Sequence, residues 1–181
     1  MPQLRGGYFS PWSITGLTDV DVPPGTYLTD YLTDQAMDLI QNCDDQPFFL
    51  NLWYYMVHTP LQAKPEKIAK YEAKAKDMGL DKVQAIEEGD FFPTEQKKEL
   101  RIQRRRIQSH PVYAAMIESL DENIGHLLQA VEDAGEADNT VVIFTSDNGG
   151  LATSEGSPTC NAPLAEGKGW MYEGGTREPL L

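Results

Sequence analysis

Two short apolar runs restrict the folds that this chain can adopt. They cover residues 47–57 and 140–145, and nearly every side chain in them is apolar, aromatic or β-branched. Each run is bounded by residues that break regular structure, and each is too short for a typical buried helix. We therefore expect two strands that are covered on both faces, as the strands of parallel sheets are. The predicted fold class is α/β, with a predominantly parallel sheet flanked by helices.

Apolar residues recur at helical spacing in residues 26–42, and again in a longer stripe that begins at Pro111. Gly135 stands where this second helix would be capped. Residues 1–26 are rich in Gly, Pro and Thr and are expected to be irregular. The charged stretch 65–108 is predicted to form two helices around a loop at 88–93. Its basic cluster (97, 98, 101 and 104–106) is interpreted as a solvated helix face rather than a polyanion site.

The net charge is −13 over 181 residues, which argues against nucleic acid or an anionic membrane surface as a partner. It does not exclude a small anionic substrate, because one lysine about 4 Å from an anion contributes roughly 4 kcal/mol before desolvation at an effective dielectric near 20. No apolar run approaches the roughly 20 residues of a membrane span. The first residues lack the plan of a signal peptide, so the compartment is left open.

Reactive side chains follow both predicted strands. His58 follows the first, and Asp147 and Asn148 follow the second on a turn that continues into Gly149 and Gly150. Ligands of open α/β sheets bind beyond the carboxyl ends of the strands, so these side chains converge if the two strands are parallel neighbours. Carboxylate and amide oxygens suit Ca²⁺ or Mg²⁺. The alternatives are a common Asp-Asn-Gly turn and a structural histidine.

A third element of interest is the glycine-rich stretch 161–179. Within it, Lys168 lies between Gly167 and Gly169, and glycines allow both the backbone and the ammonium to approach a ligand closely. By itself this stretch indicates only a flexible loop that carries a lysine. Its significance depends on the two strand ends.

Taken together, these residues resemble the sulfatase family of the alkaline-phosphatase-like superfamily. The resemblance covers most of residues 27–181, so residues 1–181 are expected to be a partial sulfatase catalytic domain with 1–26 irregular and 27–181 as its family-like core. The matching pieces are Phe48-Phe49-Leu50, Val57-His58-Thr59-Pro60, residues 113–125, Ile143-Phe144-Thr145-Ser146-Asp147-Asn148-Gly149-Gly150, Gly167-Lys168-Gly169 and Glu173-Gly174-Gly175-Thr176-Arg177-Glu178-Pro179.

The resemblance implies roles for the candidate residues. Asp147 and Asn148 would supply two ligands of a divalent cation, usually calcium, with magnesium as the other possibility. His58 would contact the sulfate and donate a proton to the leaving oxygen, and Lys168 would pair with the sulfate oxygens. The substrate would be a sulfate-ester small molecule or a sulfated carbohydrate. The compartment would be periplasmic, secreted or lysosomal. Glu173 and Arg177 are assigned to structure, as a pair that holds the loop.

Two departures from the family pattern limit this reading. Sulfatases carry an aspartate pair that completes the metal site, and a Cys-x-Pro-Ser-Arg or Ser-x-Pro-Ser-Arg element whose first residue becomes formylglycine. Neither Cys43 nor Cys160 fits that element, and whether the two thiols pair is left open. Asp44-Asp45 precedes its strand and so lies at the wrong end of the sheet. The chain is therefore expected to be a fragment that is inactive alone.

Two other functions stay open. A phosphoester or phosphonate hydrolase of the same superfamily would arrange its metal site and histidine in a similar way. A non-catalytic relic that binds an anion or a protein partner would keep the loop without the chemistry. The sequence leaves the substrate and the oligomeric state undetermined.

Overall fold

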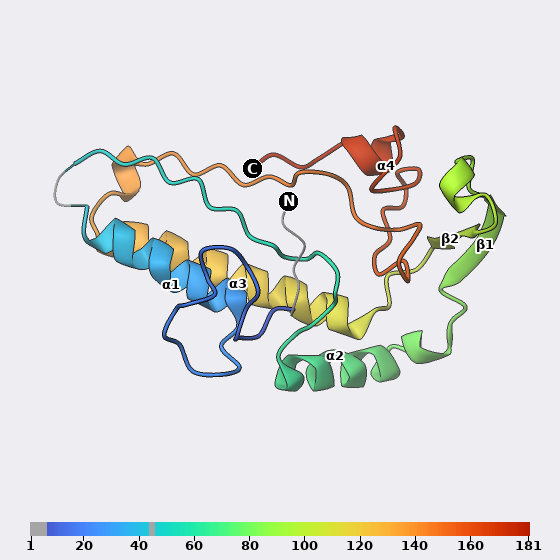
Figure 1. Cartoon of the computed structure of the whole chain (residues 1–181), viewed down its shortest axis with the longest axis horizontal. Helices are drawn as coiled ribbons and strands as arrows, with labels where there is room; N and C mark the ends of the chain where they lie inside the picture. Colours follow the sequence, from blue (N-terminus) through green and yellow to red (C-terminus); the bar gives the residue numbers. More distant parts are fainter. Residues whose placement is uncertain (1–6, 44–45) are drawn as a thin grey trace. The chain divides into compact units, whose positions relative to one another are not determined.

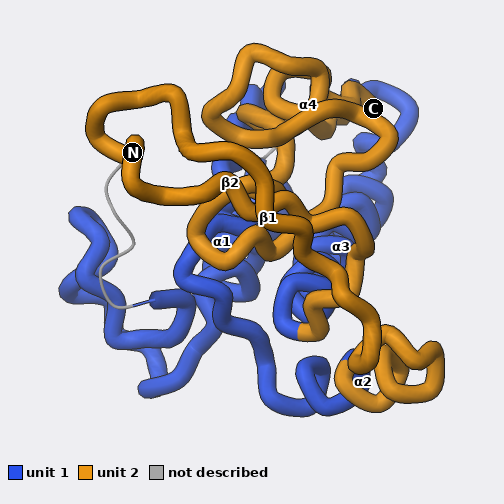
Figure 2. The backbone as a smooth tube through the Cα atoms, turned by 90° about the vertical axis from the view of Figure 1, so that its right-hand side faces the viewer, with its two compact units in different colours: residues 1–71, 112–141 blue, residues 72–111, 142–181 orange. Residues whose placement is uncertain are grey.

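The structure is a computed structural model that describes residues 7–43 and 46–181. The chain divides into two compact units, each built from two separate stretches of sequence (Figure 2). Unit 1 comprises residues 1–71 and 112–141, and unit 2 comprises residues 72–111 and 142–181. The candidate residues are divided between the units.

Unit 1 is built on helices. Helix α1 (Leu28–Gln41) lies alongside α3 (Pro111–Asp133), and α2 begins within the same unit (Pro65–Asp77) (Figure 1). The side-chain amide of Asn123 on α3 donates to Asp30 of α1 at 3.0 Å. The helices predicted over 26–42 and from Pro111 are confirmed. Gly135 has a φ of +75°, the left-handed conformation of a C-terminal cap.

The N-terminal segment supplies much of the core of unit 1. The prediction that it is irregular is confirmed for residues 7–26, which contain no helix or laddered strand. Even so, Tyr8 is fully buried, and Trp12 and Ile14 are nearly so. They pack in one cluster with Tyr27, Leu28, Ala63, Ala115 and Met116. Burial of these aromatic and aliphatic side chains, roughly 1.5–3 kcal/mol for each large one, anchors a segment that has no regular backbone pattern.

Unit 2 contains an antiparallel pair, β1 (Ile86–Phe91) and β2 (Arg101–Arg105), where the sequence predicted a second helix and a loop at 88–93. That prediction, and with it the helix face assigned to the basic cluster, is wrong. In the hairpin Glu87 lies opposite Arg104, and Ile102 is buried. Opposite charges that face each other across an antiparallel pair stabilise it. Three short helices complete the unit: η1 (Leu80–Lys82), η2 (Glu95–Lys97) and α4 (Glu173–Thr176).

The predicted buried strands are extended segments that lack a strand ladder. Neither 47–57 nor 140–145 is a strand, although Thr145 forms an isolated antiparallel bridge with Leu180. Phe49 is 91% exposed and Ile143 is 69% exposed, so their predicted burial is wrong for this chain. A strand exists only where a neighbouring backbone accepts its hydrogen bonds, and among the described residues β1 and β2 are the only laddered strands. A short helix, η3 (Ala137–Asn139), leads into the second segment.

None of the helices in the described part of the chain combines the length and the apolar character of a membrane span.

Candidate functional site

His58 lies in unit 1 at the end of the extended segment 47–57, with its side chain exposed. Its main-chain carbonyl accepts a hydrogen bond from the hydroxyl of Tyr8 at 3.0 Å, and the same hydroxyl donates to the carbonyl of Tyr55 at 2.6 Å. The imidazole Nδ1 lies 2.8 Å from the carbonyl oxygen of Thr59. When Nδ1 donates this hydrogen bond, Nε2 is the nitrogen that faces a ligand.

Tyr8 is a residue that sequence reasoning missed. Its side chain is fully buried, and burial raises the pKa of its hydroxyl, so this group donates hydrogen bonds at all physiological pH values. The hydroxyl fixes both ends of the short turn that presents His58. Because Tyr8 belongs to an irregular stretch 50 residues away, no local pattern connects it with the histidine.

Asp147 and Asn148 lie in unit 2, on a turn that the backbone stabilises. The hydroxyl of Ser146 donates to the carbonyl of Asn148 at 2.9 Å, and the Asn148 side-chain amide donates to the carbonyl of Gly149 at 3.1 Å. This second bond uses the nitrogen of the amide and leaves its oxygen available as an acceptor. The carboxylate of Asp147 is exposed. The turn therefore presents two hard oxygen groups.

A carboxylate that the sequence did not single out lies beside this turn. Residues 180–181 run antiparallel to residues 144–145, because Phe144 and Leu181 exchange two backbone hydrogen bonds of 3.0 Å and Thr145 bridges Leu180. Continued for two residues toward the turn, this register sets Glu178 opposite Asp147. Burial and then the charge of Asp147 raise the pKa of Glu178.

The glycine-rich loop packs its backbone against the same turn. The amide of Lys168 donates to the carbonyl of Gly150 at 3.1 Å, and the amide of Gly149 donates to the carbonyl of Gly175 at 3.2 Å. A Cβ on Gly149 would collide with the carbonyl of Gly174, and one on Gly167 would collide with the carbonyl of Gly150. Glycine is needed at these positions because the peptides approach more closely than any side chain allows.

Asn161 holds these segments together. Its side-chain nitrogen donates to the carbonyls of Gly150, Glu166 and Gly174, at 2.8, 3.0 and 3.2 Å. The three acceptors belong to the Asp-Asn turn, the lysine loop and α4, so one amide joins all three. We refer to this arrangement as the Asn161 clamp. A lone asparagine has no sequence signature for such a role, although the density of glycines at 149, 150, 167, 174 and 175 indicates close backbone packing.

The lysine itself is half-buried, and among the described residues no carboxylate lies within ion-pair distance of its ammonium. The neighbouring Glu166 instead pairs with Arg104 of β2. Glu173 and Arg177 form the pair expected from the sequence, at 3.3 Å, with both side chains more than two-thirds exposed. Lys168 is thus a cation available to an external anion.

The structure brings three of the four candidate residues into one unit. Asp147, Asn148 and Lys168 belong to unit 2, whereas His58 belongs to unit 1. A single crevice shared by all four side chains stays a prediction. Asp44-Asp45 lies outside the described residues, and within the described ones no group of three or more His, Cys, Asp or Glu side chains could hold a metal. Cys43 and Cys160 are free thiols.

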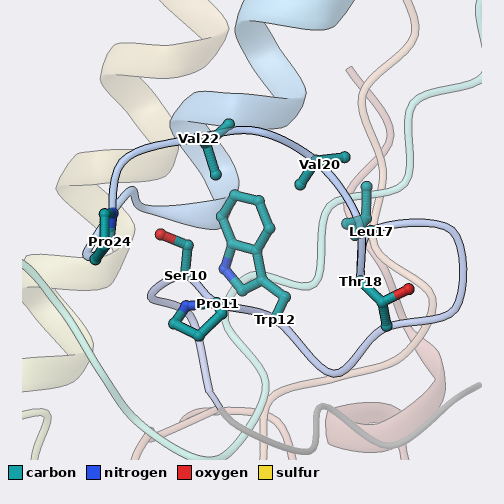
Figure 3. A pocket seen from close by; sticks show the side chains of 8 residues that line it. All are labelled: Ser10, Pro11, Trp12, Leu17, Thr18, Val20, Val22 and Pro24. Carbon is teal, nitrogen blue, oxygen red and sulfur yellow. The ribbon is translucent and has the colours of Figure 1, made fainter.

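A hollow of about 110 Å³ lies elsewhere in unit 1, in the loop between Ser10 and Pro24. Figure 3 shows the indole of Trp12 at its centre, with Val20 and Val22 above and Pro11 below. The indole nitrogen donates to the carbonyl of Tyr8 at 3.2 Å, so the ring is fixed in place. None of the candidate residues lines this hollow, and its lining is mostly apolar, so it offers no chemistry for an anion.

A protein-family model described as Sulfatase matches residues 1–181. The chain is 34% identical over 95% of its length to a sulfatase from Formosa agariphila, of which it covers 26%. It is 32% identical over 87% of its length to mouse arylsulfatase J, of which it covers 21%. The chain thus spans about a quarter of the length of these relatives.

Solved structures agree with this assignment. The crystal structure of Ps i-CgsB in complex with k-i-k-neocarrahexaose matches 90% of the chain with a TM-score of 0.61 and 31% identity, and the chain covers 29% of it. This chain belongs to the sulfatase family, and its fold class is α/β. Members of this family generally use a divalent cation and a formylglycine.

Proposed function

We propose that this chain is a segment of the catalytic domain of a sulfuric ester hydrolase, with residues 27–181 as its family-like core. The observation that carries the proposal is the hydrogen bond between the amide of Lys168 and the carbonyl of Gly150, two residues beyond Asn148. It brings the backbone of the candidate sulfate-binding lysine against the turn that carries the candidate metal ligands.

Asp147 and Asn148 would hold a divalent cation, with calcium expected first and magnesium second. Their donor set fits a hard ion, since both groups offer oxygen and the buried carboxylate oxygen of Glu178 beside them has no hydrogen-bond partner among the described residues. When bound, the cation would stabilise the negative charge on the ester oxygens. Calcium takes roughly 6–8 oxygen ligands, so water or further protein groups would complete the set.

His58 and Lys168 would act directly on the substrate. The lysine ammonium would pair with the sulfate oxygens and orient the ester. In a complete catalytic domain the nucleophile would form the new bond to sulfur. As the bond between sulfur and the leaving oxygen breaks, its electron pair would stay on that oxygen, to which Nε2–H of His58 would donate a proton. Tyr8 and the carbonyl of Thr59 would position the ring, because they hold the main chain and Nδ1.

The exposed extended segments support the expectation of a predominantly parallel sheet. Residues 47–57 and 140–145 keep the apolar composition of buried strands, and Phe49 and Ile143 expose apolar surface that a sheet neighbour would cover. We propose that both become strands when the neighbouring strands of a complete catalytic domain are present.

A sulfated carbohydrate is the substrate class that we favour. The support is the relation to Ps i-CgsB, whose crystal structure contains k-i-k-neocarrahexaose. A sulfate-ester small molecule is the other possibility. The compartment, which the resemblance suggests is periplasmic, secreted or lysosomal, stays a prediction.

A second candidate function is phosphoester or phosphonate hydrolysis. It is favoured by one relative, the multifunctional alkaline phosphatase superfamily protein PehA from Trinickia caryophylli, which is 27% identical over 82% of the chain. Sulfate and phosphate monoesters both present a tetrahedral group of anionic oxygens, so one lysine can pair with either. They differ by one negative charge. The two functions are distinguished by comparing the affinity of the chain for 4-nitrophenyl sulfate and 4-nitrophenyl phosphate.

The test of the proposal is binding of 4-nitrophenyl sulfate, measured by calorimetry in the presence of calcium. We expect binding without turnover, weakened at least about tenfold in Lys168→Ala, because the ammonium has no ion-pair partner among the described residues and is free to pair with the ester. Lys82→Ala, which removes an exposed lysine of the same unit, is the matched control. Equal affinity in both variants would contradict the site, and turnover that His58→Ala abolishes would contradict inactivity of the chain alone.

The relic alternative requires a separate experiment, because it also predicts binding without turnover. In a chimera, residues 47–181 of this chain replace the matching segment of the Formosa agariphila sulfatase. The sulfatase supplies the remainder of the catalytic domain. A chimera that hydrolyses sulfate esters supports a catalytic segment. A folded chimera that binds the ester and does not hydrolyse it supports the relic.

A further inference from the structure

The antiparallel pairing at the end of unit 2 determines which side chains stand around Asp147. Phe144 and Leu181 exchange backbone hydrogen bonds, and Thr145 forms a bridge with Leu180. In this register, one residue forward from Phe144 corresponds to one residue back from Leu181. The bridge is isolated, and its register, continued for two residues toward the turn, sets Glu178 opposite Asp147. Residues directly opposite each other in an antiparallel pair project from the same face, with Cβ atoms about 4.5–5.5 Å apart. This continued register would set the two carboxylates on one face beside Asn148.

The carboxylate of Glu178 differs from those of the neighbouring glutamates in its hydrogen-bond and ion-pair partners. Glu166 is paired with Arg104, and Glu173 is paired with Arg177. The oxygen Oε1 of Glu178, by contrast, is buried and has no hydrogen-bond partner among the described residues. A buried carboxylate oxygen without a donor is costly, about 1–3 kcal/mol or more for a charged group, and native proteins rarely retain one.

From this geometry we infer that Glu178 is a third oxygen ligand of the divalent cation held by Asp147 and Asn148. The inference rests on the proposed function, because it adds a ligand to the cation site named there. A divalent cation would neutralise both facing carboxylates and satisfy the orphaned oxygen at once. No arginine or lysine is paired with either carboxylate in the described part of the chain, so no protein cation already does so.

The three oxygens have distinct origins. Asp147 and Asn148 come from the turn after the extended segment 140–145, whereas Glu178 comes from the segment that follows α4. The Asn161 clamp fixes these two segments relative to each other, because it donates to Gly150 on one and to Gly174 of α4 on the other. A site assembled from two clamped backbones is preorganised, so the chain is expected to bind the cation without the remaining family ligands.

The experiment is calorimetric titration of the whole chain with calcium chloride, at neutral pH and moderate salt. The variants are Glu178→Gln, Asp147→Asn as the reference for a lost ligand, and Glu173→Gln as the matched control that removes a glutamate charge five residues away. We expect the first two to bind calcium at least about tenfold more weakly than the unaltered chain, since loss of even an indirect metal partner costs about 10–100-fold. Glu173→Gln should bind as the unaltered chain does.

The outcomes separate this inference from the function on which it rests. Weak binding in Asp147→Asn together with unaltered binding in Glu178→Gln would overturn the role of Glu178 and leave the proposed cation site standing. Absence of calcium binding by the unaltered chain would overturn the inference, while sulfate-ester binding through Lys168 would still be measurable. If Glu178→Gln does not fold, Glu178→Asp serves instead: it keeps the charge and withdraws the carboxylate by one methylene, and an unchanged affinity would overturn the inference.

Discussion

Arg104 and Glu166, which lie 62 residues apart, form a bidentate ion pair in unit 2. The guanidinium Nε lies 3.0 and 2.9 Å from the two carboxylate oxygens, and Nη2 lies 2.8 Å from Oε1. The side chains are only 21% and 13% exposed. This pair joins β2 to the loop that presents Lys168, because Glu166 is separated from the lysine by one glycine.

We predict that Glu166→Gln lowers the free energy of unfolding by about 1–3 kcal/mol, because a half-buried guanidinium loses its charged acceptor. The measurement is urea unfolding followed by tryptophan fluorescence, which reports on unit 2 through Trp170. Glu173→Gln removes an ion pair of similar kind whose side chains are 68% and 67% exposed, and it should change stability by less than about 1 kcal/mol. Equal effects of the two variants would contradict a structural role for the pair.

Two glycines should respond in opposite ways to alanine. The Cβ of Gly149→Ala would collide with the backbone of Gly174, which cannot move without breaking the Asn161 clamp, so this variant should be destabilised and its affinity for 4-nitrophenyl sulfate reduced. Gly125 is exposed within α3, and a Cβ there would meet nothing. Gly125→Ala should therefore stabilise the protein by about 0.5–1 kcal/mol. Thermal unfolding of both variants checks the contrast, and destabilisation by both would refute it.

The stability of unit 1 should depend on pH through Glu118. A hydrogen bond from Lys70, with a second from Lys67, lowers the pKa of Glu118 from its ordinary 4.5 to about 2. A group whose pKa is lower in the folded state stabilises that state above its unfolded pKa, and this contribution is lost as the pH falls from 4.5 through 2.

The unaltered chain should therefore have a higher melting temperature than Glu118→Gln at pH 6, and the difference should shrink as the pH falls from 4.5 to 2. Melting curves of both proteins across this range provide the measurement. Asp121→Asn removes an exposed carboxylate of the same helix and is the control for the lost charge. If the melting temperatures of the chain and of Glu118→Gln differ as much at pH 2 as at pH 6, the ion pairs of Glu118 are not the cause of the difference.

The parts of the fold that the sequence predicted are those determined by local pattern. Apolar spacing defined α1 and α3, and a glycine in the left-handed conformation ended α3. The hairpin of β1 and β2 was not predicted, because its stability comes from ion pairs across strands, such as Arg106 with Glu87, and a charged stretch has no distinctive period. Propensity treats each residue separately, whereas these pairs join residues about 20 apart.

The candidate site shows the same division. Asp147, Asn148 and Lys168 stood out because their neighbours in sequence include the glycines that allow close approach. Glu178 and Asn161 did not, because each acts on segments that are distant in sequence: Glu178 lies opposite Asp147 only through the register of two extended segments, and Asn161 donates to three separate carbonyls. A single sequence does not encode these pairings in any local pattern.

The Asn161 clamp gives the last prediction. Asn161→Asp is nearly isosteric but replaces the donating nitrogen with an oxygen, so three carbonyls lose this donor and face a negative charge instead. We expect a loss of about 2–3 kcal/mol in the free energy of unfolding, and faster hydrogen exchange at the amides of Gly149, Lys168 and Gly174, whose hydrogen bonds join the clamped segments. Asn139→Asp, at an exposed position, is the matched control. If exchange at these three amides is unchanged, the segments are held by their glycine packing alone, and the preorganised cation site must be attributed to that packing rather than to Asn161.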